Sequence, residues 1–185
     1  IGQYAFYNTD IKGDLEIPYS IKLVRQYAFA FCSELTGNLY INATYIATNA
    51  FYSSGFSNAL SLGYNVQNLN IASSYDGTNS NPPPTVYGEI RTFRGCNFKQ
   101  VSLSNQGSIP YRAFYQMTSI NNALYIPKTI TSIETEAFAG CTEITGLTFE
   151  EDQKTITGSY LTIGIAAFMG CIGITNKLVL NRALY

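Results

Sequence analysis

The chain has 185 residues, of which 46% are hydrophobic and only 12% are charged, and its formal net charge is −1. This balance excludes a disordered chain, which is poor in apolar residues and rich in charge, and it excludes the basic surface that a nucleic-acid partner needs. The sequence has no histidine, which excludes imidazole general bases, Ser-His or Cys-His nucleophile pairs and His-ligated zinc.

The dipeptide Ala-Phe recurs along the chain. Its phenylalanines are Phe6, Phe29, Phe51, Phe114, Phe138 and Phe168, and the pair Thr92-Phe93 is an altered seventh copy. Successive phenylalanines are 23, 22, 42, 21, 24 and 30 residues apart. A period near 22 with one doubled interval predicts a repeat array.

Each repeat begins with a short segment around the Ala-Phe pair whose apolar residues share one face at helical spacing. In the clearest copy these residues are Ile133, Ala137, Phe138 and Cys141, which fall together at about 3.6 residues per turn. Such a segment is too short to be stable as an isolated helix. We therefore predict a short helical or 3-10 turn, held by packing, on the convex side of each coil.

A strand follows each Ala-Phe segment, because the pattern changes to apolar residues at every second position. In chain order these apolar triplets are residues 15–17, 39–41, 60–62, 101–103, 124–126, 147–149 and 178–180. No such unit can bury its apolar side chains alone, whereas stacked units share one core. The expected fold class is a repeat solenoid whose strands form a parallel β-sheet on the concave face.

The doubled interval between Phe51 and Phe93 calls for an extra coil that has lost its Ala-Phe segment, with Leu69-Asn70-Ile71 as its strand. Residues 73–87 contain Asn81-Pro82-Pro83-Pro84 and read as a Pro-rich inserted loop. A smaller insertion is expected near residues 150–160. Residues 1–185 are thus predicted to be a single solenoid of about seven to eight repeats.

The repeat unit I-x-x-x-A-F-x-x-C-x-x-L-x-x-x-L-x-I-P is clearest at residues 133–149 and resembles the BspA-like leucine-rich-repeat family. The resemblance covers nearly the whole chain except about residues 64–90 and 150–160. It implies a secreted or surface-displayed protein linked to adhesion, without a catalytic residue set. The chain departs from the pattern at Gly88, which holds the leading Ile position, and at Ser54 and Met117, which hold the Cys position.

The middle residue of each strand triplet is expected to point outward along the concave sheet. These candidate binding residues are Glu16, Tyr40, Ser61, Asn70, Ser102, Tyr125 and Thr148. Tyrosine is a rigid contact residue that is common in binding surfaces, so Tyr40 and Tyr125, about four strands apart, stand out. Five further tyrosines flank the Ala-Phe pairs and are expected on the convex side: Tyr4, Tyr27, Tyr52, Tyr111 and Tyr115.

All four cysteines occupy the same position, three residues after the phenylalanine. This shared position indicates free buried thiols that act as small apolar fillers, although a bridge between Cys141 and Cys171 in neighbouring coils stays open. Residues 150–152, Glu-Glu-Asp, fit a solvated loop better than a calcium site. We expect no metal site and no cofactor.

The sequence therefore favours an extracellular or cell-surface binding module that is not an enzyme. Its partner would be a host or microbial surface protein or a glycan, bound through the concave sheet or the 73–87 loop. A structural stalk is the alternative, and a β-helix polysaccharide-active enzyme is disfavoured because acids and bases do not cluster. No run of about 18 apolar residues occurs, so we expect no membrane insertion of this segment. End-to-end self-association of exposed coils is a further expectation.

Overall fold

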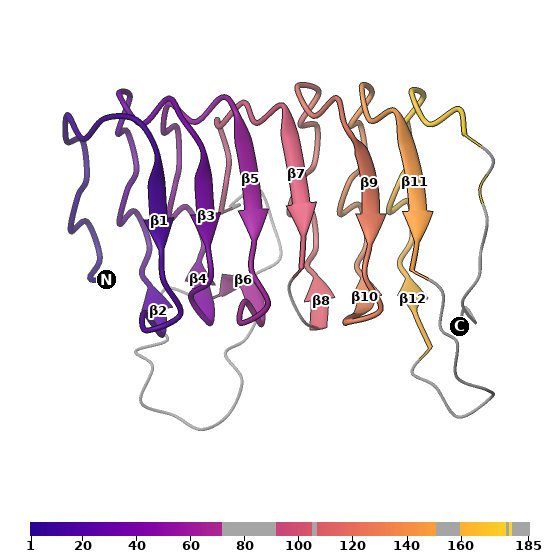
Figure 1. Cartoon of the computed structure of the whole chain (residues 1–185), viewed down its shortest axis with the longest axis horizontal. Coiled ribbons are helices and arrows are strands. Elements are labelled where there is room, and N and C mark those ends of the chain that lie inside the picture. Colours follow the sequence, from indigo (N-terminus) through magenta and orange to yellow (C-terminus); the bar gives the residue numbers. More distant parts are fainter. Residues whose placement is uncertain (72–91, 105–106, 151–159, 177, 179–185) are drawn as a thin grey trace.

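The computed structural model describes residues 1–71, 92–104, 107–150, 160–176 and 178, and these residues wind into a parallel β-solenoid (Figure 1). Each coil contributes two short strands, and each coil stacks on the next. In chain order the strands are β1 (Leu15–Ile17), β2 (Leu23–Val24), β3 (Leu39–Ile41), β4 (Tyr45–Ala47), β5 (Ala59–Leu62), β6 (Asn68–Ile71), β7 (Gln100–Leu103), β8 (Gly107–Ile109), β9 (Ala123–Ile126), β10 (Ile130–Ile133), β11 (Gly146–Phe149) and β12 (Thr162–Ile163).

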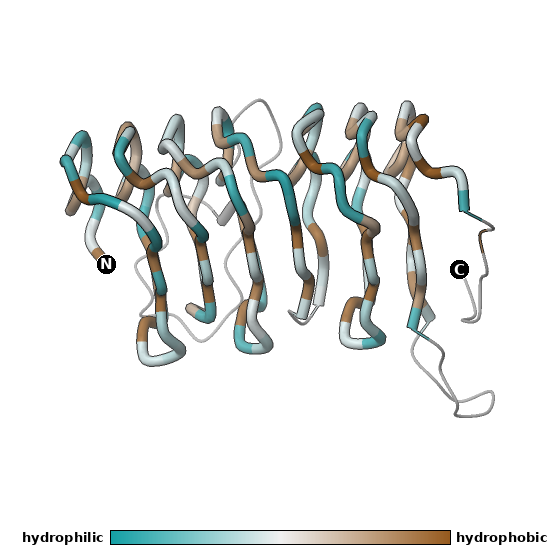
Figure 2. Tube along the Cα trace, turned by 45° about the horizontal axis from the view of Figure 1, so that its top comes forward, coloured by the Kyte–Doolittle hydropathy of each residue, from teal (hydrophilic) through white to brown (hydrophobic). Residues whose placement is uncertain are grey.

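The odd-numbered strands form one row and the even-numbered strands form a second row. The first row contains the sheets β1-β3-β5-β7 and β9-β11, and the second contains β2-β4-β6 and β8-β10-β12. Equivalent residues lie side by side, as when Leu39 of β3 pairs with Leu15 of β1 and with Leu60 of β5. Hydrophobic and hydrophilic residues alternate along the strands (Figure 2), which places one side chain in two inside the coil. The predicted parallel solenoid is therefore confirmed.

The Ala-Phe segments form the third side of each coil, and the helical turns expected there are absent from the described residues. Around Phe29, Tyr27 and Phe31 have left-handed φ angles of 57° and 60°, which a right-handed helix does not allow. Backbone hydrogen bonds run instead from Ala30 N to Tyr27 O within the coil and from Phe29 N to Ala50 O of the next coil. The apolar spacing correctly indicated a buried face, but the backbone hydrogen bonds of the segment also join neighbouring coils.

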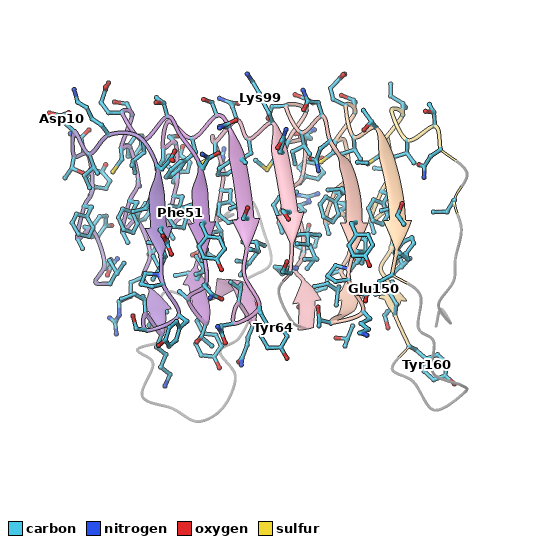
Figure 3. The ribbon with its side chains drawn as sticks, viewed as in Figure 1. Asp10, Phe51, Tyr64, Lys99, Glu150 and Tyr160 are labelled. Carbon is cyan, nitrogen blue, oxygen red and sulfur yellow. The ribbon has the colours of Figure 1, made fainter. Side chains whose placement is uncertain are left out.

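The phenylalanines of these segments stack along the solenoid axis (Figure 3, where Phe51 is labelled). Successive ring centroids lie 4.9–6.0 Å apart and interplanar angles are 2–18°. The stack comprises Phe6, Phe29, Phe51, Phe93, Phe114, Phe138 and Phe168. This column of rings is the centre of one continuous core.

The extra coil expected between Phe51 and Phe93 does not exist. The Phe93 ring stacks directly on the Phe51 ring at 5.8 Å, and Phe51 N donates to Thr92 O at 3.1 Å. Strand β5 also pairs directly with β7. The triplet at residues 69–71 belongs to β6, which pairs with β4 in the second row, so the doubled interval is one coil with an insertion. The 73–87 loop lies outside the described residues, and so do residues 151–159 of the smaller insertion.

The four cysteines are free and buried, but they are not merely apolar fillers. Each thiol donates to the carbonyl oxygen of the phenylalanine in the preceding coil, with Sγ–O distances of 2.9–3.1 Å. The pairs are Cys32 with Phe6, Cys96 with Phe51, Cys141 with Phe114 and Cys171 with Phe138. Ser54 makes the same bond with its hydroxyl, to Phe29 O. A small hydrogen-bond donor therefore holds this position in most coils, and Met117 is the exception.

Candidate functional site

Six of the seven predicted binding residues lie on one surface, which we call the strand face: the outward side of the first row of strands. Parallel pairing places Glu16 beside Tyr40, Tyr40 beside Ser61 and Ser61 beside Ser102, and it places Tyr125 beside Thr148. Ser61 is half-buried and the other five are exposed, while their strand neighbours on either side are mostly buried. The strand periodicity thus identified an outward row of residues.

Asn70 does not belong to this row, and its assignment is wrong. It lies on β6, in the second row of strands, because residues 69–71 are the second strand of the coil that begins with β5. Without an extra coil, Tyr40 on β3 and Tyr125 on β9 are three strand positions apart rather than four. Their side chains are 38% and 51% exposed, so both are available for contact.

The first row is interrupted between β7 and β9, which belong to separate sheets. The Asn122 side chain lies where strand pairing would continue. Its Oδ1 accepts from Val101 N at 3.0 Å, and its Nδ2 donates to Val101 O at 3.1 Å. One amide thereby satisfies the two backbone groups that a neighbouring strand would satisfy.

A hollow of about 420 Å³ opens at this interruption, and we call it the strand-face hollow. Its lining includes two of the predicted binding residues, Ser102 and Tyr125, together with Asn122. Small-molecule and side-chain pockets typically measure ~300–1,000 Å³, so this hollow can accept a protruding group. Sequence reasoning missed Asn122, although Asn58, Asn122 and Asn176 share the position two residues before a strand triplet.

Tyr125 is the most exposed aromatic residue of the strand face, and its surroundings keep it protonated. Desolvation, and then the negative charge of Glu150, raise the pKa of the Tyr125 hydroxyl above its ordinary value. Glu150 in turn accepts from Lys128 N at 2.9 Å and lies 3.8 Å from Lys128 Nζ. The phenol therefore stays neutral at physiological pH and can both donate and accept a hydrogen bond.

The tyrosines expected on the convex side lie along the Ala-Phe segments, on what we call the turn face. There Arg112 lies over the rings of Tyr111 and Tyr115, at 5.1 and 4.5 Å from their centroids. Arg112 also pairs with Glu136, and its hydrogen bond to this carboxylate raises the pKa of the guanidinium. This group links neighbouring coils.

Within the described residues, no three His, Cys, Asp or Glu side chains are grouped to hold a metal ion. The described part of the chain also contains no helix that is long and apolar enough to span a membrane.

The comparisons with known proteins agree with this architecture. The model of the BspA type leucine rich repeat region, in six copies, matches residues 1–80. The searches of curated proteins and of solved structures returned no match. Beyond the matched range, the phenylalanine stack continues to Phe168 and the thiol-to-carbonyl bonds to Cys171. Residues 1–80 are therefore similar to the BspA type leucine rich repeat region, and the same repeat contacts continue beyond them.

Proposed function

We propose that this protein is an extracellular or cell-surface binding module whose strand face engages a surface protein or glycan of a host or of another microbe. One observation carries the proposal: exposed tyrosines and a hollow lie on the same face. Tyr125 lines the strand-face hollow, and Tyr40 projects from the same row of strands. The similarity to BspA-type repeats supports a binding role in general, since such repeats are typically scaffolds for recognition rather than catalysis.

The chemistry of the strand face suits a macromolecular partner. Its outward residues are two tyrosines, three small hydroxyl residues and a single carboxylate, Glu16. Tyrosine combines a large apolar ring with a hydrogen-bonding hydroxyl and loses little conformational entropy on binding. The serine and threonine residues beside the tyrosines are small and leave the tyrosine rings accessible. Because the parallel strands hold these residues in fixed register, the surface is organised before a partner arrives.

The test is binding of the purified chain to a panel of matrix proteins and glycans, measured by surface plasmon resonance. The Tyr40→Ala/Tyr125→Ala variant should lose at least tenfold in affinity, because Tyr residues commonly contribute about 1–2 kcal/mol or more at interface hot spots. The matched control is Tyr19→Ala/Tyr64→Ala, since these tyrosines are 73% and 59% exposed but lie outside the strand row.

The possible results separate the competing interpretations. Loss of binding in the strand-face variant, with an unchanged melting temperature and a control that still binds, supports the proposal. Full binding by the strand-face variant contradicts it and directs attention to the 73–87 loop. If the wild-type chain binds no member of the panel, a structural stalk becomes the better account.

A further inference from the structure

A closed circuit of five aromatic rings lies on the turn face of the first three coils. Tyr4 and Tyr7 come from the first coil, Tyr27 and Phe31 from the second, and Tyr52 from the third. Each ring contacts two others, in the order Tyr4, Tyr7, Phe31, Tyr52, Tyr27 and back to Tyr4, with centroid distances of 5.2–6.4 Å. Tyr4 stacks on Tyr27, and the other four contacts are edge-to-face.

The same five rings surround a hollow of about 380 Å³, which we call the aromatic hollow. Two polar residues in the described part of the chain also line it, Asn49 and Arg94. The Asn49 Nδ2 donates to the Tyr27 hydroxyl at 3.0 Å, while its Oδ1 is buried and has no hydrogen-bond partner among the described residues. Arg94 lies over the Tyr52 ring, 5.8 Å from its centroid.

Stability alone does not account for these rings. Tyr4, Tyr27 and Phe31 have left-handed φ angles of 59°, 57° and 60°, which bulky residues adopt at a cost of about 1–2 kcal/mol. The position of Phe31, two residues after the stacked phenylalanine, is taken in later coils by Gly95, Gly140 and Gly170 and by the non-aromatic Ser53 and Gln116. Glycine adopts this conformation without the penalty. Two aromatic residues at such positions, Tyr4 and Phe31, are 52% and 39% exposed, which indicates a role at the surface.

We propose that the aromatic hollow binds a pyranose ring of a glycan. The C–H bonds on one side of a pyranose carry partial positive charge and pack against the electron-rich faces of aromatic rings. Four of the five rings carry a phenolic hydroxyl, and Asn49 and Arg94 add amide and guanidinium groups, so the apolar walls have a hydrogen-bonding rim. The buried Asn49 Oδ1 needs a donor, and sugar hydroxyls are donors.

The charges around the hollow argue against the other common occupant of aromatic enclosures, a quaternary ammonium group. Among the residues that the structure describes, no carboxylate lines the hollow, and the one charged lining residue, Arg94, is a cation already placed over Tyr52. A second cation would be repelled, whereas a hydroxyl-rich neutral ring would not. The site goes beyond the strand-face proposal, because it uses different residues on a different side of the coil.

The experiment is a glycan array probed with the wild-type chain, followed by calorimetric titration of the strongest ligand. The test variant is Tyr4→Asn/Tyr7→Ser. Both tyrosines are exposed, at 52% and 42%, and asparagine tolerates the left-handed conformation of residue 4, so the fold should persist. The matched control is Tyr115→Ser, which removes a ring from the same position after the phenylalanine as Tyr7, but outside the hollow.

The expected result is glycan binding that the Tyr4→Asn/Tyr7→Ser variant weakens at least tenfold, while Tyr115→Ser and Tyr40→Ala/Tyr125→Ala retain it. This pattern would hold even if the strand face bound nothing. Equal binding by the test variant and wild type, or absence of any glycan ligand on the array, would overturn the proposal. Binding of tetramethylammonium that the test variant abolishes, without glycan binding, would also overturn it.

Discussion

At the scale of single residues, neighbouring coils are joined by stacked phenylalanine rings and, in most coils, by a side-chain hydrogen bond. Its donor is the Cys or Ser three residues after the phenylalanine. Phe138 is fully buried between Phe114 and Phe168, at centroid distances of 4.9 and 5.4 Å. The Cys171 thiol donates to the Phe138 carbonyl at 3.1 Å. A substitution here therefore affects three coils at once.

Phe138→Ala should lower the free energy of unfolding by about 3–5 kcal/mol, because it removes a buried ring and leaves a cavity. That is a large share of the ~5–15 kcal/mol total typical of folded proteins. Chemical denaturation followed by circular dichroism measures the loss. Phe168→Ala is the control. Because Phe168 is half-buried, its removal should lower the free energy of unfolding by less. Equal stability of Phe138→Ala and wild type would contradict the core assignment.

The buried thiols should make the protein less stable at high pH. Desolvation raises the pKa of Cys96 and Cys141 from an ordinary value of 9.0 to about 12. Between these two values the unfolded chain loses thiol protons that the folded chain keeps, so the free energy of unfolding falls as pH rises from about 9 to about 12. Below pH 9 the contribution is fully present.

The measurement is the denaturation midpoint of wild type and of Cys96→Ser/Cys141→Ser between pH 7 and 11. Serine should preserve the bond to the phenylalanine carbonyl, as Ser54 does, but it does not titrate. The variant should therefore show a shallower decline than wild type, and parallel curves would contradict the assignment. Tyrosine ionisation is common to both proteins and cancels in the comparison.

At the scale of elements, the two rows of strands are held differently from the Ala-Phe segments. The strands use regular parallel pairing, the segments use overlapping turns bonded between coils, and the interruption between β7 and β9 uses a side chain. Asn122 supplies both hydrogen bonds to Val101, and Asn176 supplies both to Leu147. Asn122 and Asn176 therefore complete the backbone hydrogen bonding of the preceding strand, whereas Asn58 bonds to the Asn38 side chain.

Asn122→Leu should lower the free energy of unfolding by about 2–6 kcal/mol, because two buried backbone groups of Val101 lose their partners at about 1–3 kcal/mol each. Asn121→Leu is the control, since the Asn121 side chain is exposed and only its backbone bonds to the preceding coil. Amide hydrogen exchange at Val101 provides a local readout. Unchanged protection of that amide in Asn122→Leu would show that the side chain is dispensable.

The sequence predicted an element correctly where the element's pattern is visible in its own residues, and it failed where the pattern is not visible there. Alternation in residues 39–41 predicted β3 and the outward side of Tyr40, because a strand reveals its exposed face in its own residues. The turns around Phe29 were mistaken for helix, since their left-handed residues, Tyr27 and Phe31, are not the glycine that would signal them. The triplet at 69–71 was placed in the wrong row because both rows share the same alternation.

The candidate sites also differ in whether the sequence could predict them. The strand face repeats at one position per coil and was therefore predictable, apart from Asn70. The two hollows were not, because each combines side chains from different coils, such as Tyr7, Phe31 and Tyr52 at 5.2–5.4 Å. Such contacts depend on which coils stack directly, and the insertion after β6 conceals that Phe93 follows Phe51 in space.

At the scale of the whole molecule, the last described coil leaves apolar side chains uncovered. Ile165, Met169 and Ile172 are 81%, 59% and 78% exposed. We expect this 185-residue chain to self-associate with increasing concentration through that coil, as sedimentation velocity would reveal. Ile172→Lys should reduce the association, whereas Tyr64→Lys, which replaces a side chain 59% exposed elsewhere, should not. A sedimentation coefficient independent of concentration would contradict the expectation.

The bonds between coils point along the axis of the stack, and this direction has a mechanical consequence. A force that pulls the two ends apart acts on every coil boundary, but an end coil can peel away first, by breaking bonds such as Phe6 N to Ala28 O. The solenoid should then unwind one coil at a time from an end instead of resisting as a unit. With about 22 residues per coil, each release would lengthen the chain by about 75 Å. A solenoid built this way would extend stepwise under tension and dissipate the load gradually.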